Sequence, residues 1–250
     1  SRDPMSTELL NGIHSVEAAL NYDAGNILEL YVESGQQNPR VRELAERARD
    51  AGGKPHARDK ADLDRMTGGA RHQGIAAKYR APPARSESDL PAIIDAAGNS
   101  ALFLVLDGVT DPHNLGACLR SAEAAGVTAV IVPKDKAAGI TPTVRRASAG
   151  AADRVPFVAS TNLARSLKLL RQSGIWLTGL AGDGNQSLYA CDFKGPVAVV
   201  IGSEGEGMRR LTREACDFIA RIPMQGSVES LNVSVATGVV LFEVLRQRTG

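Results

Sequence analysis

The second half of the chain alternates short, wholly apolar runs with stretches of helical periodicity. Apolar runs of this length, bounded by turn-forming residues, are typical of strands buried on both faces of a sheet. Strands that alternate with helices form a parallel sheet with helices on both faces. We therefore predict an α/β fold with strands at residues 101–106, 127–132, 175–180, 197–201 and 218–222.

A smaller α/β pattern precedes this half. It has a helix near His14, a strand from Ile27 and a helix from Pro39, whose preceding Asn38 is a favourable helix start. One apolar stripe follows on that helix: Val41, Leu44, Ala45 and Ala48. We expect one domain at residues 5–80, a linker at 81–99 that contains Pro82-Pro83, and a second domain at 100–250. Residues 1–4, which precede Met5, are interpreted as an expression scar.

Polar residues follow the strand at 101–106. A turn-forming Thr-Asp-Pro-His-Asn segment leads into a helix, which Asn114 is placed to start and Gly126 to terminate. Arg120 lies about a turn and a half further along. It interrupts a small and apolar run, so we expect it to bind an anion.

A glycine-rich turn follows the strand at 197–201. Its order, Gly202-x-x-Gly205-x-Gly207, is reversed relative to the dinucleotide-binding fingerprint. Glu204 and Glu206 would repel a pyrophosphate, and the chain has no P-loop motif. The turn therefore favours a ligand that is neutral or cationic where it makes contact, such as a sulfonium.

The last helix carries an apolar stripe, which we expect to face a core: Leu231, Val235, Val239, Phe242 and Leu245. Ser230, Asn232 and Ser234 crowd its first turn, where backbone N–H groups lack helical partners. Two interpretations stay open at this point. Ser230 caps an ordinary packing helix, or the three side chains belong to a site.

Composition excludes several classes of protein. No apolar run approaches the roughly 20 residues that span a bilayer. The three cysteines and four histidines have no metal-ligand spacing, so we expect no metal, and the cysteines are consistent with a reducing compartment. The net charge is only +1. RNA contacts would therefore come from local clusters: Arg58 with Lys60, Arg71 with His72, Arg145-Arg146, and Arg209-Arg210 with Arg213.

Three segments together resemble the motifs of the SpoU family of 2′-O-ribose methyltransferases, within the SPOUT superfamily. They are Asn114-Leu-Gly-Ala-Cys-Leu-Arg-Ser-Ala, Ile201-Gly-Ser-Glu-Gly-Glu-Gly-Met, and Ile222-Pro-Met through Ser230-Leu-Asn-Val-Ser-Val-Ala. The resemblance extends from about Gly12 nearly to the C-terminus. It implies methyl transfer from S-adenosylmethionine to the ribose 2′-OH of a guanosine in the peptidyl-transferase P loop of 23S ribosomal RNA. The substrate would be this RNA or the assembling large ribosomal subunit.

The resemblance also implies an architecture. The first domain would be a small L30e-like α/β RNA-binding domain. The second would be a parallel-sheet methyltransferase domain with a C-terminal trefoil knot, a feature that no periodicity could reveal. The protein would be a cytoplasmic homodimer with its active site near the subunit interface.

Residue by residue, the resemblance places Gly202, Ile222 and Leu231 against the cofactor, with the loop after Leu180 as a further wall. Arg120 matches the position that activates the hydroxyl. Because a guanidinium is not deprotonated in proteins, we interpret Arg120 as gripping the neighbouring phosphate and stabilising the developing alkoxide. Glu204 orients Arg120, accepts the proton, or forms a structural pair. Asn114, Asn232 and Ser234 orient the substrate or cap helices.

Three other functions remain as alternatives. A transfer RNA methyltransferase of the same family is the nearest, and the extra first domain counts against it. A nicotinamide-dependent oxidoreductase is disfavoured by the reversed glycine order. A non-catalytic RNA-binding protein is disfavoured because Asn114, Arg120, Glu204 and Asn232 occur together.

Overall fold

A computed structural model describes residues 6–81, 85–135 and 139–250. The chain divides into two compact units. The first comprises Ser1–Pro83 with Ile140–Arg146, and the second comprises Ala84–Gly139 with Ala147–Gly250. The expected scar at residues 1–4 and the Pro82-Pro83 pair lie outside the described residues.

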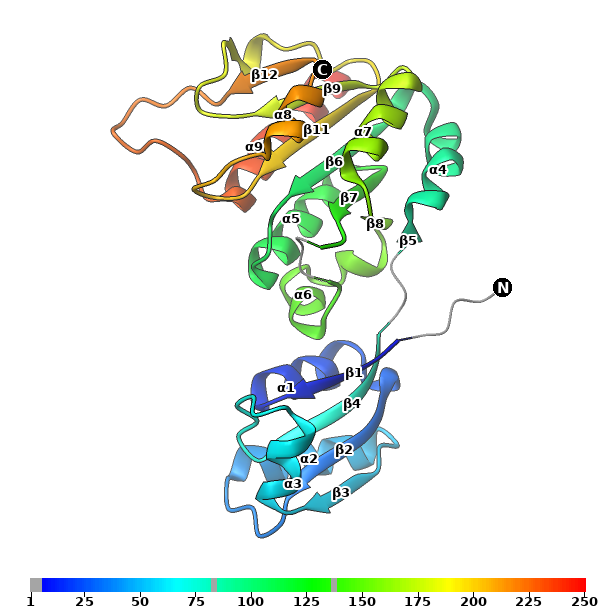
Figure 1. Cartoon of the computed structure of the whole chain (residues 1–250), viewed down its shortest axis with the longest axis vertical. Coiled ribbons are helices and arrows are strands. Elements are labelled where there is room, and N and C mark those ends of the chain that lie inside the picture. Colours follow the sequence, from blue (N-terminus) through cyan, green and yellow to red (C-terminus); the bar gives the residue numbers. More distant parts are fainter. Residues whose placement is uncertain (1–5, 82–84, 136–138) are drawn as a thin grey trace. The chain divides into compact units, whose positions relative to one another are not determined.

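The first unit contains a four-stranded mixed sheet in the order β1-β4-β2-β3 (Figure 1). Strand β4 pairs antiparallel with β1 and β2, and β3 pairs parallel with β2. Helices α1 and α2 pack on one face, where their apolar residues and alternate strand residues form a core. The elements are β1 (Ser6–Asn11), α1 (Ile13–Tyr22), β2 (Ile27–Glu33), α2 (Pro39–Asp50), β3 (Pro55–Arg58), α3 (Lys60–Met66) and β4 (Ile75–Ala81).

Helix α2 begins as predicted. The Asn38 side chain accepts a hydrogen bond from the Arg40 N–H, and Pro39 occupies the first turn, where a missing N–H costs no helical bond. The predicted stripe of Val41, Leu44, Ala45 and Ala48 is buried.

The second unit contains an eight-stranded sheet in the order β10-β12-β9-β11-β6-β7-β8-β5, and every pairing is parallel. The parallel sheet and its five expected strands are therefore confirmed, while β5, β8 and β10 were not predicted. The strands are β5 (Arg85–Ser86), β6 (Leu102–Asp107), β7 (Ala129–Pro133), β8 (Phe157–Ser160), β9 (Trp176–Leu180), β10 (Gln186–Ser187), β11 (Val197–Gly202) and β12 (Phe218–Arg221).

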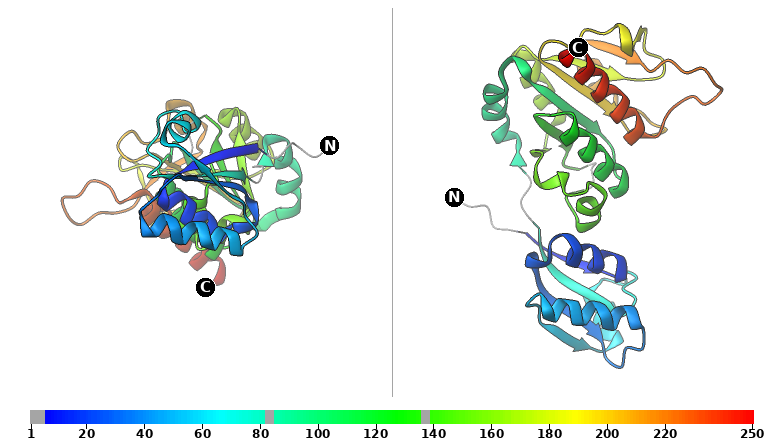
Figure 2. Two further views of the ribbon diagram at one scale, coloured as in Figure 1. Left: turned by 90° about the horizontal axis from the view of Figure 1, so that it is seen from below. Right: turned by 180° about the vertical axis from the view of Figure 1, so that it is seen from behind.

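Helices cover both faces of this sheet, as Figures 1 and 2 show from opposite sides. Helices α4 and α7 share a core with one face, and α8 packs beside α7. Helices α5 and α9 pack against each other, and α9 contacts β11. The unit's helices are α4 (Leu90–Ala97), α5 (Pro112–Ala124), α7 (Leu163–Gln172), α8 (Arg210–Ala215) and α9 (Val233–Thr249); α6 (Pro142–Ala147) belongs mostly to the first unit.

The segment interpreted as a linker, residues 81–99, carries structure of the second unit. Strand β5 pairs with β8, and Leu90 and Ile94 of α4 lie in the core beneath α7. The structure therefore differs from the sequence interpretation after residue 84. Pro and Ser near these residues resemble linker composition, but the apolar residues that follow contribute to a core.

The stripe expected to bury α9 is also different in the structure. Val235 and Phe242 are 52% and 46% exposed, whereas Val240, Leu241 and Val244 are fully buried. The prediction that the Val235–Phe242 stripe faces a core of the chain is wrong. Both sides of α9 are apolar, so periodicity alone did not identify the side that packs.

Candidate cofactor and substrate site

A cavity of about 1090 Å³ opens at the carboxyl ends of β9, β11 and β12 in the second unit. Ligands of parallel α/β sheets characteristically bind at this edge. Gly202, Ile222 and Leu231, which sequence analysis assigned to one cofactor, all line this cavity, and Leu180 does too. The structure therefore brings these four residues together from three separate loops.

The glycine turn after β11 folds back onto its own strand. The Gly207 N–H donates to the Ser203 carbonyl at 2.9 Å, and Gly205 and Gly207 have φ values of +82° and +68°. A Cβ on Gly202 would lie 2.1 Å from the Gly207 carbonyl carbon. Gly202 thus allows the close return of the chain, and the turn presents backbone groups to the cavity.

Asp107, at the end of β6, anchors this turn. It is 1% exposed, and its two carboxylate oxygens accept from the Arg209 backbone N–H at 3.0 Å and from Arg209 Nε at 2.8 Å. The sequence pattern alone did not assign a role to Asp107. A carboxylate that ends an apolar strand was the available signal, because a buried charge needs a partner.

Acidic side chains outnumber basic ones around the cavity. Its lining carries four acids, Asp183, Glu204, Glu206 and Glu229, and two arginines, Arg213 and Arg221. Arg213 grips Asp183 with two hydrogen bonds of 3.0 and 3.2 Å, which hold the pKa of that carboxyl below its ordinary value. The cavity therefore has the electrostatics of a site for a ligand with a cationic part.

Four of the expected site residues meet at the start of α9. Asn232 is the N-cap: its Oδ1 accepts from the Ser234 N–H at 2.9 Å, while its Nδ2 donates to Asn114 Oδ1 at 3.1 Å. The Ser234 hydroxyl also donates to Asn232 Oδ1. Glu204 reaches in from the glycine turn and accepts from the Val233 N–H at 2.8 Å. Of the two interpretations left open, the one in which Ser230 caps α9 does not hold, because Asn232 and Glu204 satisfy the first N–H groups.

The start of α5 differs similarly from expectation. Asp111, one residue before Pro112, accepts from the His113 and Asn114 N–H groups and is the N-cap. The Asn114 side chain is thereby left to contact Asn232. The prediction that Asn114 starts this helix is therefore wrong, since Asp111 occupies that position.

Arg120 is not joined to this group. It is exposed on α5 and makes no hydrogen bond or ion pair with the residues that the structure describes. A Glu204–Arg120 pair, one of the alternatives left open for Glu204, is not formed among the described residues, because the Glu204 carboxylate accepts from the Val233 N–H at the start of α9. An exposed guanidinium with no partner retains all five donors for an anion.

Some members of the clusters expected to contact RNA are held by acidic neighbours. Within the first unit, Arg145 is buried 3.5 Å from Asp23, and His72 contacts Asp64 at 2.7 Å. Lys60 also pairs with Asp64. The described residues hold no group of three side chains suited to a metal ion, and none of their helices is long and apolar enough to cross a membrane.

The cysteines have the chemistry of buried thiols. Burial raises the pKa of Cys118 to about 11 and that of Cys216 to about 12. Both thiols therefore stay protonated at neutral pH and are poor nucleophiles.

Comparisons with known proteins cover both units. A family model for the substrate-binding domain of RNA 2′-O ribose methyltransferases matches residues 9–84, and a model for the SpoU rRNA methylase family matches residues 101–242. Two bacterial relatives are named 23S rRNA (guanosine-2′-O-)-methyltransferase RlmB. The Xanthomonas campestris protein is 54% identical and covers 96% of each chain. The Xylella fastidiosa protein is 56% identical and covers 95% of this chain and 96% of its own.

A solved structure has the same fold. The SpoU methyltransferase AviRb from Streptomyces viridochromogenes, in complex with the cofactor AdoMet, matches with a TM-score of 0.64 and 26% identity. The match covers 98% of this chain and 91% of that one. The family model over residues 101–242 and these full-length relatives show that the chain belongs to the SpoU family of RNA methyltransferases.

Proposed function

We propose that this protein transfers a methyl group from S-adenosylmethionine to the ribose 2′-OH of a guanosine in 23S ribosomal RNA. The observation that carries the proposal is that relatives named for this activity match both units of the chain at more than half identity. A transfer RNA substrate is not favoured, because these full-length relatives are named for ribosomal RNA. The target within the peptidyl-transferase P loop is the finer part of the proposal.

The cavity suits S-adenosylmethionine, which supplies an electrophilic methyl group on a sulfonium. Glu204, Glu206 and Glu229 place negative charge around a ligand that carries two cationic centres. Ile222 and Leu231 offer apolar surface for an adenine ring, and Gly202 belongs to a turn with accessible backbone groups. These three residues are our proposed cofactor contacts. No metal is needed for such a transfer.

The side chains around the start of α9 would hold the nucleophile. Asn114 and Asn232 already hydrogen-bond to each other, so their remaining donors and acceptors have fixed directions toward a substrate. Ser234 fixes Asn232 from the other side. Such positioning aligns a ribose hydroxyl with the reacting methyl and lowers the entropic cost of the reaction.

Arg120 has the role of an anion-binding residue. Its exposed fork can grip a phosphate beside the reacting ribose through two parallel hydrogen bonds and stabilise the developing alkoxide. The proton acceptor would be Glu204 or water. Glu204 Oε1 is engaged by the Val233 N–H, which leaves Oε2 for this role.

A homodimer would cover the exposed face of α9. Val235, Val239 and Phe242 lie on one side of the helix, and Val235 and Phe242 are about half exposed. Exposed apolar stripes of this kind mark protein interfaces. We expect sedimentation to give a dimer for the native chain and a monomer for Val235→Glu/Phe242→Glu. A monomeric native chain would contradict this part of the proposal.

The remaining architecture is proposed on the same basis. The mixed sheet with helices in the first unit supports an L30e-like RNA-binding domain at residues 5–80. In the second unit, α8 packs on the side of α7, whereas α9 packs with α5 after the chain has left β12. The trefoil knot is proposed from the resemblance to the SpoU family, because helices on both faces of a sheet also occur in unknotted folds. A protein that acts on 23S RNA or the assembling large subunit would work in the cytoplasm.

The decisive test maps ribose methylation in 23S RNA from cells that carry the native gene, no gene or an Arg120 variant. We expect one guanosine to lose its methyl group in the deletion strain. Arg120→Ala and Arg120→Lys should both fail to restore it, because a point charge does not reproduce a planar fork. Their S-adenosylmethionine affinity should match the native value, as Arg120 does not line the cofactor cavity. Unchanged 23S methylation in the deletion strain would contradict the proposed function.

A further inference from the structure

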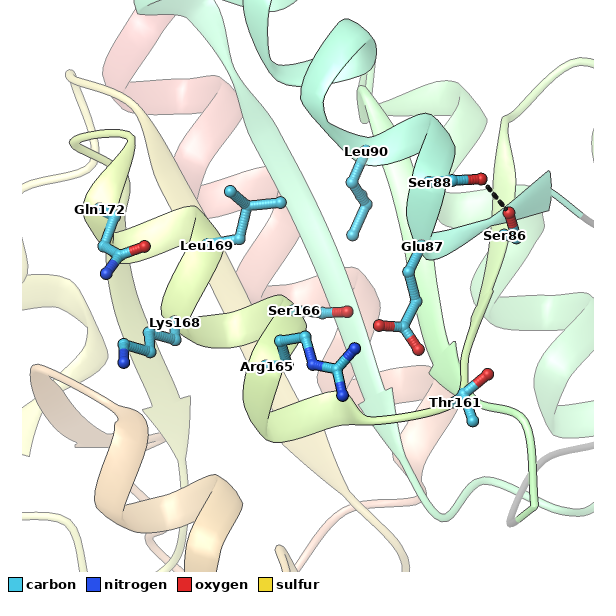
Figure 3. Close-up of a pocket in the computed structure, with 10 residues that line it drawn as sticks. All are labelled: Ser86, Glu87, Ser88, Leu90, Thr161, Arg165, Ser166, Lys168, Leu169 and Gln172. Carbon is cyan, nitrogen blue, oxygen red and sulfur yellow. Dashed lines mark hydrogen bonds between the residues drawn. The ribbon is translucent and has the colours of Figure 1, made fainter.

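A second groove, of about 790 Å³, lies on the same unit between α7 and the segment that follows β5 (Figure 3). This groove, which we call the α7 groove, is separate from the cofactor cavity, and the two share no lining residue. Arg165, Lys168 and Gln172 line it from α7, at helical spacing. Ser86, Glu87 and Ser88 line its other side.

The two cations in the α7 groove are available to an anion. Arg165 and Lys168 are exposed, and neither forms an ion pair with any residue in the described part of the chain. Their neighbour on the helix, Arg171, is by contrast paired with Asp217 at 3.1 Å. Glu87 is the acid in the groove lining, and its Oε1 accepts from the Asn162 N–H at 2.8 Å. The groove therefore carries a net positive charge.

Neutral groups complete the chemistry of the groove. Thr161 presents an exposed hydroxyl, which can donate to a phosphate oxygen, whereas the Ser86 and Ser88 hydroxyls hydrogen-bond to each other at 2.6 Å (Figure 3). The half-buried Leu169 supplies apolar surface, and Leu90, which also lines the groove, is fully buried. Cations, a hydroxyl and apolar surface suit a sugar–phosphate strand, whose phosphates and ribose faces alternate.

The topology places the mouth of this groove on the same sheet edge as the cofactor cavity. Strands β5, β8 and β11 are parallel, so Ser86, Ser160 and Gly202 all end at that edge. Three strand spacings separate β11 from β8, which amounts to about 14 Å. A strand of RNA with its reacting ribose at the cavity would need only a few nucleotides to reach the groove.

The charge of the cofactor cavity explains why such a second contact is needed. The cavity carries four acids and two arginines, one of which is already paired with Asp183, so phosphates are repelled there. We propose that the α7 groove binds the phosphate backbone of the substrate RNA a few nucleotides from the methylated ribose, through Arg165 and Lys168. This inference rests on the proposed function.

The test uses the full chain with Arg165→Gln/Lys168→Gln. Glutamine is a good helix former, so α7 should persist, and melting should stay within about 2 °C of native. Filter binding of a 23S RNA fragment across a salt series should show about a tenfold loss of affinity at low salt. The log–log salt slope should fall by about 1.5, as expected for two lost phosphate contacts. S-adenosylmethionine affinity should be unchanged.

A matched control is Lys194→Gln. Lys194 is exposed on the same unit and precedes β11, at the opposite edge of the sheet. Native affinity and salt slope are expected for this variant. An equal loss in the control, or native RNA binding by the double variant, would overturn the proposal. A photo-crosslinker at Gln172 should capture the RNA fragment, and capture of a ribosomal protein in its place from purified subunits would also overturn it.

One further assay distinguishes an incorrect assignment of the α7 groove from an incorrect proposed function. The native protein is first assayed for methylation of the same 23S fragment. No methylation by the native protein would contradict the proposed function. If the native protein methylates the fragment and the double variant binds RNA as well as the native protein, only the RNA-binding role of the α7 groove is contradicted.

Discussion

The two ends of α9 are held in different ways. At its C-terminal end, Arg248 donates four hydrogen bonds of 2.7 to 3.1 Å to backbone carbonyls of Ser100, Ala101, Phe193 and Gly195. Gln247 adds bonds to the Cys191 carbonyl and from the Phe193 N–H. At its N-terminal end, the exposed Asn232 bonds to the Asn114 and Ser234 side chains, and the Glu204 carboxylate accepts from the Val233 N–H.

The C-terminal end of α9 anchors the helix, whereas its N-terminal end carries the polar groups proposed to contact the substrate. The carbonyls bound by Arg248 precede β6 and β11, the two central strands that end at the site. The C-terminal end therefore fixes α9 against the sheet. Because the helix of 17 residues is rigid, this anchoring also sets the position of Asn232 at its other end. The exposed N-terminal end keeps its polar groups accessible to a substrate.

The largest expected effect comes from Asn232→Ala at the free end. Removal of the side chain deletes both the cap and the contact with Asn114, so we expect methyl transfer to fall at least 100-fold. Loss of a cap costs about 1 kcal/mol of unfolding free energy. Single-turnover methylation and urea unfolding measure the two effects separately.

Asn232→Asp is the matched control for this variant. It retains the capping acceptor but removes the Nδ2 donor to Asn114. We expect native stability with most of the activity lost. Full activity in the aspartate variant would show that the N-terminal end matters only for folding, and the comparison between the ends would fail.

The sequence predicted the parts of this arrangement that depend on regular patterns. Wholly apolar runs located the five strands, and the order of strands and helices implied that Gly202 and Ile222 end strands at one edge. Asn38 was identified correctly because it stands directly before a proline and an amphipathic stripe. These signals are local, so they survive without knowledge of the tertiary fold.

The parts that failed depend on which neighbours pack. Helix α9 is apolar on two sides, and only contact with α5 and β11 determines that Val240 is buried and Phe242 exposed. Asp111 and Asn114 are both favourable N-caps, and the helix begins at Asp111, directly before Pro112. Arg248 was overlooked because its acceptors lie in distant backbone segments.

The next largest expected effect is a loss of stability in Arg248→Ala. Four bonds from a charged donor are lost and their carbonyls are left with water, so we expect the unfolding free energy to fall by about 2 to 3 kcal/mol. Below the unfolding transition, the methylation rate should change less than threefold. Arg210→Ala is the control, because Arg210 is exposed and its ion pair with the exposed Glu214 contributes little to stability. Equal destabilisation by both variants would show that the C-terminal anchor is not specific to Arg248.

The smallest expected effect is a pH-dependent change in stability at the C-terminal end of α9, caused by Glu243. Hydrogen bonds from Arg246 and Gln247 lower the pKa of Glu243 to about 2. A depressed carboxyl pKa stabilises the fold above the ordinary value of about 4.3, and this stabilisation disappears as pH falls toward 2. Glu243→Gln should therefore unfold at a lower urea concentration than the native chain at pH 7, and this difference in urea midpoint should narrow between pH 4.5 and pH 3.

The control is Glu214→Gln, which removes an exposed pair with Arg210. It should leave the urea midpoint nearly unchanged over the same range. If the difference in urea midpoint for Glu243→Gln stays constant down to pH 3, its carboxylate does not contribute charge-dependent stability, and the anchoring of this end rests on Arg248 and Gln247 alone.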